Sequence, residues 1–73
     1  MMARYYSILR PVSINTYPTP RDNKVLGIKN FGERKYCEEI RREAWGYIDY
    51  EKDLTPKDAN IYDLMYGECN ENK

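Results

Sequence analysis

Hydrophobic and polar positions change their spacing several times along this 73-residue chain, and each change predicts a structural element. Between Ala3 and Leu9, apolar and polar side chains alternate imperfectly, which favours a strand rich in aromatic and branched residues. Residues 11–24 contain three prolines and no periodic pattern, so they predict a long loop. Alternation resumes from Val25 to Asn30, which predicts a second strand.

The spacing becomes that of an amphipathic helix over residues 31–45. Four residues of this segment fall in one narrow stripe on a helical projection: Tyr36, Cys37, Ile40 and Ala44. The Asn30 side chain can accept a hydrogen bond from the amides of the first turn, and the Glu33 side chain can accept one from the Asn30 amide in a capping box. Gly46 can adopt the left-handed conformation that ends a helix. The pattern therefore predicts a capped helix from about Phe31 to Trp45.

Two further elements follow in the last third of the chain. Alternation over residues 47–51 predicts a third strand that is half exposed to water. Thr55 followed by Pro56 is typical of a helix start, because Thr caps the amides and Pro lacks the amide that would be unpaired there. The apolar face of this second helix is Ile61, Tyr62, Leu64 and Met65. Gly67 is predicted to end it.

The predicted order of elements is therefore β-β-α-β-α. The simplest fold of this class is α+β, with a small three-stranded, mainly antiparallel sheet, one helix packed on a face and a second, C-terminal helix. Residues 1–67 are expected to form a single small domain, because the chain is short, and residues 68–73 a polar, flexible tail. An open sheet of this kind leaves an edge strand exposed, and pairing of that edge across a twofold axis makes a homodimer a candidate assembly.

Composition and charge narrow the choice of function. Hydrophobic residues are 41% and charged residues 33%, which is typical of a globular protein, and eight of the ten aromatic residues are tyrosine. The formal net charge is zero, but residues 1–32 sum to +4 and residues 33–73 to −4. An even total argues against a protein that coats nucleic acid by charge alone and against an acidic DNA mimic. It allows a bipolar surface.

The chain has few of the residue types and motifs that are typical of catalytic or cofactor sites. The chain has no histidine, no phosphate-binding glycine run and no fixed metal-ligand pattern, so no catalytic residue, metal or cofactor is predicted. Cys37 lies on the predicted apolar stripe and is interpreted as a buried, reduced thiol, and Cys69 falls in the tail. No segment approaches the ~20 apolar residues that span a bilayer, and no signal peptide is apparent. We therefore expect a cytoplasmic protein without a membrane partner.

Two functions from different classes remain. The first is a non-catalytic protein-interaction module that binds another protein or a second copy of itself. Its candidate surface is Arg4, Tyr5, Arg10, Tyr17, Arg21, Lys24 and Trp45. The alternative is a small nucleic-acid-binding accessory protein, in which the tyrosines of the basic N-terminal half stack on bases and its cations meet phosphates. A plainer interpretation is that the tyrosines fill the core and the cations keep the protein soluble.

Several segments together resemble a known family. They are Tyr5-Tyr6-Ser7-Ile8 with Arg10-Pro11, Thr16-Tyr17-Pro18, Asn30-Phe31, Tyr36-Cys37-Glu38-Glu39-Ile40 and Glu43-Ala44-Trp45-Gly46-Tyr47. With them, residues 4–65 resemble a group of short uncharacterised proteins encoded by conjugative elements and prophages of anaerobic gut bacteria. The resemblance carries no activity, cofactor or catalytic residue. It implies a bacterial cytosolic accessory protein concerned with element transfer or host defence.

Overall fold

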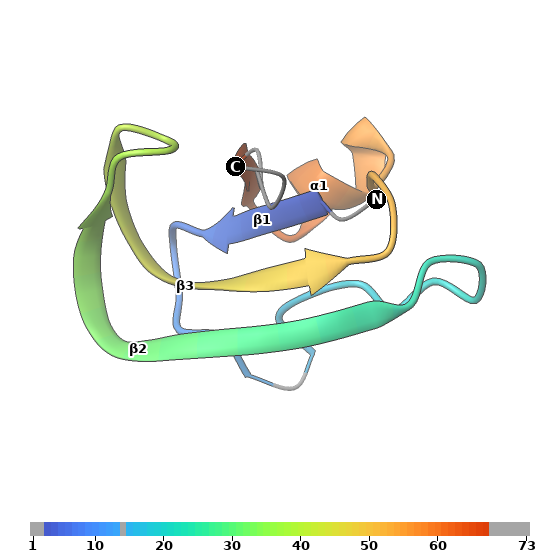
Figure 1. Ribbon diagram of the computed structural model, residues 1–73, viewed down its shortest axis with the longest axis horizontal. Helices are drawn as coiled ribbons and strands as arrows, with labels where there is room; N and C mark the ends of the chain where they lie inside the picture. Colours follow the sequence, from blue (N-terminus) through green and yellow to red (C-terminus); the bar gives the residue numbers. More distant parts are fainter. Residues whose placement is uncertain (1–2, 14, 68–73) are drawn as a thin grey trace, which may run out of the picture.

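The described residues form a four-stranded antiparallel sheet with one short helix. The computed structural model describes residues 3–13 and 15–67. The elements in chain order are β1 (Ala3–Ser7), β2 (Val25–Cys37), β3 (Arg42–Tyr50), α1 (Pro56–Ile61) and β4 (Leu64–Gly67). The strands lie in the spatial order β2-β3-β1-β4, so β2 and β4 form the two edges (Figure 1). The N-terminal strand, β1, is therefore central and pairs with β3 on one side and β4 on the other.

The predicted fold class is wrong in two respects. The sheet has four strands rather than three, and the helix predicted over residues 31–45 does not exist. Those residues form the second half of β2, a turn and the first half of β3, and they pair as an antiparallel hairpin in which Lys35 lies opposite Ala44. Among the described residues α1 is the one helix, six residues long, so the fold is mostly β rather than a balanced α+β arrangement.

A long-range contact explains why the helical spacing was misleading. Cys37, Ile40 and Ala44 do share one side of the segment, but they do so because the hairpin turn brings them together against Tyr6 of β1. Tyr36, the fourth residue of the predicted stripe, points to solvent with 64% of its surface exposed. An isolated helix of this length is only marginally stable in water, so tertiary packing decides the conformation.

The cap residue of the predicted helix serves a different local structure. The Asn30 side-chain oxygen accepts a hydrogen bond from the Gly32 amide, at 3.1 Å, and Gly32 has a φ of 80°. Asn side chains stabilise such turns as readily as helix starts. The register of β2 against β3 shifts between Asn30 and Lys35, and Figure 1 shows β2 bending sharply before it reaches the hairpin turn. The signal at Asn30 therefore marks a bend within a strand.

The predicted start of the second helix is confirmed, whereas the predicted position of its end is wrong. Thr55 is the N-cap of α1, its hydroxyl accepts from the Asp58 amide, and Pro56 is the first helical residue. The helix ends at Ile61 rather than at Gly67. Asp63 then adopts a φ of 54°, and the chain turns into β4, which pairs with β1. The predicted tail at residues 68–73, with Cys69, lies outside the described residues.

The two faces of the sheet bury separate apolar clusters. On one face Tyr5, Ile48 and Tyr50 pack with Leu54. On the other face Tyr6 packs with Cys37, Ile40 and Ala44 of the hairpin. Neighbouring residues of β1 thus enter different clusters, because successive side chains of a strand point to opposite faces. The prediction that Cys37 is buried is confirmed, with 7% of its surface exposed.

The predicted loop at residues 11–24 is confirmed as irregular structure at its described residues, 11–13 and 15–24, and side chains fix it to the sheet. The Val12 carbonyl accepts from the Asn30 side-chain amide at 2.8 Å, and the Pro18 carbonyl accepts from the Tyr50 hydroxyl at 2.7 Å. Val12 and Tyr17 also pack on the cluster around Tyr50. The loop therefore acts as a cover for one face of the sheet. No described helix is long and apolar enough to cross a membrane.

Candidate functional site

Arg4, the first residue of the predicted surface, is bonded to a neighbouring strand of the sheet. Its guanidinium binds both carboxylate oxygens of Asp49 on the neighbouring strand, at 2.7 and 3.1 Å. The same group lies 3.8 Å from the centre of the Tyr47 ring. Such planar, two-point pairing holds a guanidinium in a fixed orientation, and the stacked ring adds a cation–π contact. Arg4 therefore stabilises the sheet through these contacts.

The predicted tyrosines are also structural. Tyr5 is buried, and its hydroxyl accepts from the Leu54 amide at 2.9 Å, which fixes the loop before α1. Its ring contacts Tyr50 and Tyr66 edge-on. Tyr17 is half-buried against the same cluster. These residues form the core that the plainer interpretation of the sequence described, rather than a row of rings open to a ligand.

The remaining predicted residues are dispersed. Arg10 pairs with Asp63 at 2.9 Å and donates to the Tyr62 carbonyl, so it fastens the segment after β1 to the turn after α1. Arg21 and Lys24 are exposed in the loop before β2. Trp45 is half-buried in β3, where the pairing with β2 is irregular. The seven residues therefore do not form one surface.

The outer edge of β2 is the surface that the structure brings together instead. We call residues 25–37, on the side facing away from β3, the β2 edge. Three large apolar side chains of this strand are about half exposed or more: Leu26 (50%), Ile28 (47%) and Tyr36 (64%). Within the described chain, the only backbone that pairs with this strand is β3. An unpaired edge that displays apolar side chains is a typical site for strand addition by a partner.

Sequence reasoning missed the β2 edge because it divided this strand between a short strand and a helix. One signal was available. The predicted strand already reached Asn30, and the aromatic residues Phe31 and Tyr36 beyond it favour extended structure. The strand interpretation of residues 31–37 was therefore open, but the capping signals around Asn30 favoured the helix.

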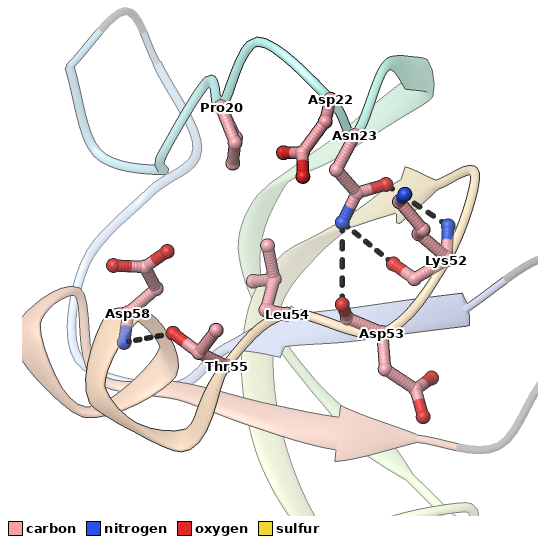
Figure 2. Close-up of a pocket in the computed structure, with 8 residues that line it drawn as sticks. All are labelled: Pro20, Asp22, Asn23, Lys52, Asp53, Leu54, Thr55 and Asp58. Atoms are coloured by element: carbon pink, nitrogen blue, oxygen red, sulfur yellow. Dashed lines mark hydrogen bonds between the residues drawn. The ribbon is translucent and has the colours of Figure 1, made fainter.

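One pocket, of about 100 Å³, lies between the loop before β2 and the segment before α1 (Figure 2). Its lining is Pro20, Asp22, Asn23, Lys52, Asp53, Leu54, Thr55 and Asp58. Some of these polar groups bind one another. The Asn23 side chain donates to the Lys52 carbonyl at 2.7 Å and accepts from the Lys52 amide at 2.9 Å. No group of described residues has the arrangement of three or more acids or cysteines that could hold a metal ion. The hydrogen bonds beside the pocket thus connect the loop before β2 to the segment before α1.

Replacing Asn23 with alanine is expected to lower the free energy of unfolding by about 2 kcal/mol, since the side chain is buried and its partners lose their hydrogen bonds. Urea denaturation followed by circular dichroism measures the change. Asp22→Ala is the matched control, because Asp22 is exposed beside it, and its change should stay below about 0.5 kcal/mol. Equal losses in the two variants would contradict the structural role of Asn23.

Burial also sets the proton affinity of several groups in the core. Removal from water raises the pKa of the Cys37 thiol, and the nearby Glu39 carboxylate raises it further. Burial likewise raises the pKa of Tyr6 to about 12, with a smaller contribution from Glu39. The pKa values of Tyr5 and Tyr50 are raised for the same main reason. A thiol with a raised pKa holds little thiolate at neutral pH, so Cys37 is a poor nucleophile.

Comparison with known proteins identifies a family. The family described as "Defence against restriction A C-terminal" matches residues 1–69, nearly the whole chain. This family is associated with phage and other mobile elements, which confirms the coarser part of the resemblance. The restriction to gut bacteria stays a prediction. Neither the curated proteins nor the solved structures gave a match.

Proposed function

We propose a function for this chain from its family, since it belongs to the family described as defence against restriction A, C-terminal. In this proposal the chain is a non-catalytic module. It protects incoming DNA from restriction by binding a protein. The observation that carries the binding part is the β2 edge, an exposed 13-residue strand with an unpaired outer side. Extended segments bind such edges through backbone hydrogen bonds, while neighbouring side chains supply selectivity.

The apolar side chains of the β2 edge support a protein partner. Leu26 and Ile28 lie within three residues of one another and are both about half exposed. Single exposed apolar residues are common, but a group of them on an unpaired strand is a typical interaction site. Tyr36 adds an exposed aromatic ring further along the same strand. Aromatic residues are enriched among those that dominate binding at protein interfaces.

The state of the reactive groups supports the non-catalytic part of the proposal. Cys37 is buried with a raised pKa, and Asp49 is paired with Arg4. Tyr5, Tyr6 and Tyr50 are protonated core residues at neutral pH. A catalytic nucleophile or base needs access to substrate and a pKa near the working pH. None of these groups combines the two properties.

The nucleic-acid alternative has less support. It required the cations and rings of the N-terminal half to be free for phosphates and bases. Arg4 and Arg10 instead form ion pairs with Asp49 and Asp63, and Tyr5 is buried. Binding to single- or double-stranded DNA that falls steeply with salt concentration would revive this alternative.

A transformation assay tests the proposed function. Unmethylated plasmid DNA is introduced into a restricting bacterial strain that expresses the chain, and into a non-restricting strain as reference. We expect the wild-type chain to raise the number of transformants only in the restricting strain. A double variant, Leu26→Ser with Ile28→Ser, should lose this protection because it removes the apolar groups of the β2 edge.

The matched control is Leu9→Ser with Ile61→Ser. Both residues are 59% exposed and lie outside the β2 edge, so the same loss of apolar surface occurs elsewhere. This control should protect as well as the wild type. Absence of protection by the wild-type chain would refute the role in restriction, and equal loss in both double variants would refute the role of the β2 edge.

A further inference from the structure

Among the described residues the β2 edge has no backbone partner on its outer side, and the sequence of this long strand is self-complementary. The strand runs from Val25 to Cys37, so Phe31 is its central residue. Lys29 and Glu33 lie two positions to either side of Phe31, and both are exposed. Neither forms an ion pair within the part of the chain that the structure describes. The strand thus offers a free cation and a free anion at mirror positions.

We propose that β2 pairs antiparallel with β2 of a second copy of this chain, about a twofold axis at Phe31. This inference rests on the proposed function, because it names the occupant of the β2 edge. The pairing joins two four-stranded sheets into one continuous sheet. It supplies partners for the backbone groups on the outer side of β2, which is the common way in which an open edge is closed.

Charge selects the register among the symmetric alternatives. With the axis at Phe31, Lys29 of each copy lies opposite Glu33 of the other, which gives two opposite-charge pairs. Moving the axis to Gly32 places Lys29 opposite Lys35, and like charges directly across a strand pair are destabilising. Moving it to Asn30 places Lys29 opposite Phe31 and loses both pairs. Only the first of these registers uses all 13 residues of the strand.

Apolar exposure favours the same register. With the axis at Phe31, Leu26 of one copy lies opposite Tyr36 of the other, so two of the most exposed apolar side chains cover each other. Ile28 lies opposite Arg34, whose aliphatic stem can pack along it. These contacts remove from water the side chains that the monomer leaves on its surface.

The side chains brought together lie on matching faces. Phe31 contacts the Tyr47 ring, and the Lys35 amine lies 5.9 Å from the centre of the Phe31 ring. Lys29 is paired with Tyr47, so Lys29, Phe31 and Lys35 share one face. Residues directly opposite in an antiparallel pair also share a face. Alternation from Lys35 places Glu33 on this face too, as its pairing with Lys29 of the other copy requires.

The twofold axis repeats the bend of β2 in both copies. Bulges in an edge strand usually discourage pairing with another chain. Here the irregular part of each copy, between Asn30 and Lys35, lies opposite residues 27–32 of the other, so the two bends are offset about the axis and point toward the same side of the joined sheet. Stable interfaces bury ~1,200 Å² or more. We expect a contact confined to one pair of strands to be smaller, and the dimer therefore to be weak and reversible.

Sedimentation equilibrium tests the pairing, with protein concentrations from about 1 μM to about 1 mM to cover a weak association. We expect the wild type to move from monomer to dimer across this range. Lys29→Glu should weaken the dimer roughly tenfold or more, because two attractive pairs become repulsive, and Glu33→Lys should do the same. The double variant Lys29→Glu with Glu33→Lys should dimerise as the wild type does, since it exchanges the charges and keeps their complementarity.

Lys57→Glu on α1 is the matched control, an exposed charge reversal outside the β2 edge, and it should leave dimerisation unchanged. Circular dichroism confirms that each variant is folded. A wild type that is monomeric throughout the range, or a double variant that fails to regain dimerisation, would refute the pairing. If the protein is monomeric while the Leu26 and Ile28 variant still loses protection from restriction, the β2 edge binds a different protein and only the inference of self-pairing fails.

Discussion

Replacing Gly46 with alanine is expected to unfold most of the protein at room temperature. A β-carbon at this position of β3 would overlap the Lys29 carbonyl oxygen of the neighbouring strand, and it would lie 2.9 Å from a methyl group of Val12. The carbonyl belongs to paired backbone and cannot rotate away as a side chain could. We expect a loss of at least about 3 kcal/mol, which is comparable to the whole stability of a domain this small.

Gly27→Ala is the control for this substitution. A β-carbon there would meet only the Asp49 carboxylate at 3.9 Å, which is an ordinary contact, and Gly27 lies on the paired strand β2. Its thermal unfolding midpoint should remain close to that of the wild type. A Gly46→Ala variant that melts at the same temperature as Gly27→Ala would contradict the close approach of β2, β3 and the loop at this point.

Alkaline pH is expected to unfold the protein through its buried tyrosines. A tyrosine in the unfolded chain loses its proton near pH 10, whereas burial keeps Tyr6 protonated to about pH 12, the value to which its pKa is raised. The folded state therefore binds more protons than the unfolded state between these values, so stability falls as pH rises through them. The raised pKa values of Tyr5 and Tyr50 add to the same loss.

Urea denaturation at a series of pH values from neutrality upward measures this effect. The free energy of unfolding should begin to decrease near pH 9, where the Cys37 thiol of the unfolded chain loses its proton, and should decrease steeply between pH 10 and pH 12. Tyr6→Phe should make the decrease shallower, because one buried titrating group is removed. Tyr36→Phe is the control, since Tyr36 is exposed, and it should leave the slope unchanged. A stability that does not vary across this interval would contradict the burial of the three phenols.

The sequence predicted the elements whose causes are local. The proline-rich loop, the strand at β1 and the start of α1 at Thr55 and Pro56 follow from backbone restrictions and from a single capping hydrogen bond. The hairpin of β2 and β3 depends on Tyr6, some thirty residues earlier in the chain, against which Cys37, Ile40 and Ala44 pack. The spacing of apolar residues within 31–45 carries no information about a contact with Tyr6, so a helix was the better interpretation of that segment alone.

The candidate surface was less predictable than the fold. Exposure of Arg21 and Lys24 followed from their position in a loop. The pairing of Arg4 with Asp49 and of Arg10 with Asp63 depends on which strands become neighbours, and that order was not available from the letters. The β2 edge was missed for the same reason, because an edge strand is defined by the strand order of the whole sheet.

The central position of β1 has a consequence for biosynthesis. β1 precedes both of its partners, β3 and β4, in the chain. During synthesis β1 must therefore wait, with its tyrosines exposed, until β4 has been translated. Sheets closed by such distant partners fold slowly, since a large loop must be ordered before the contacts form. The sheet of this protein is thus completed only after β4 has been translated.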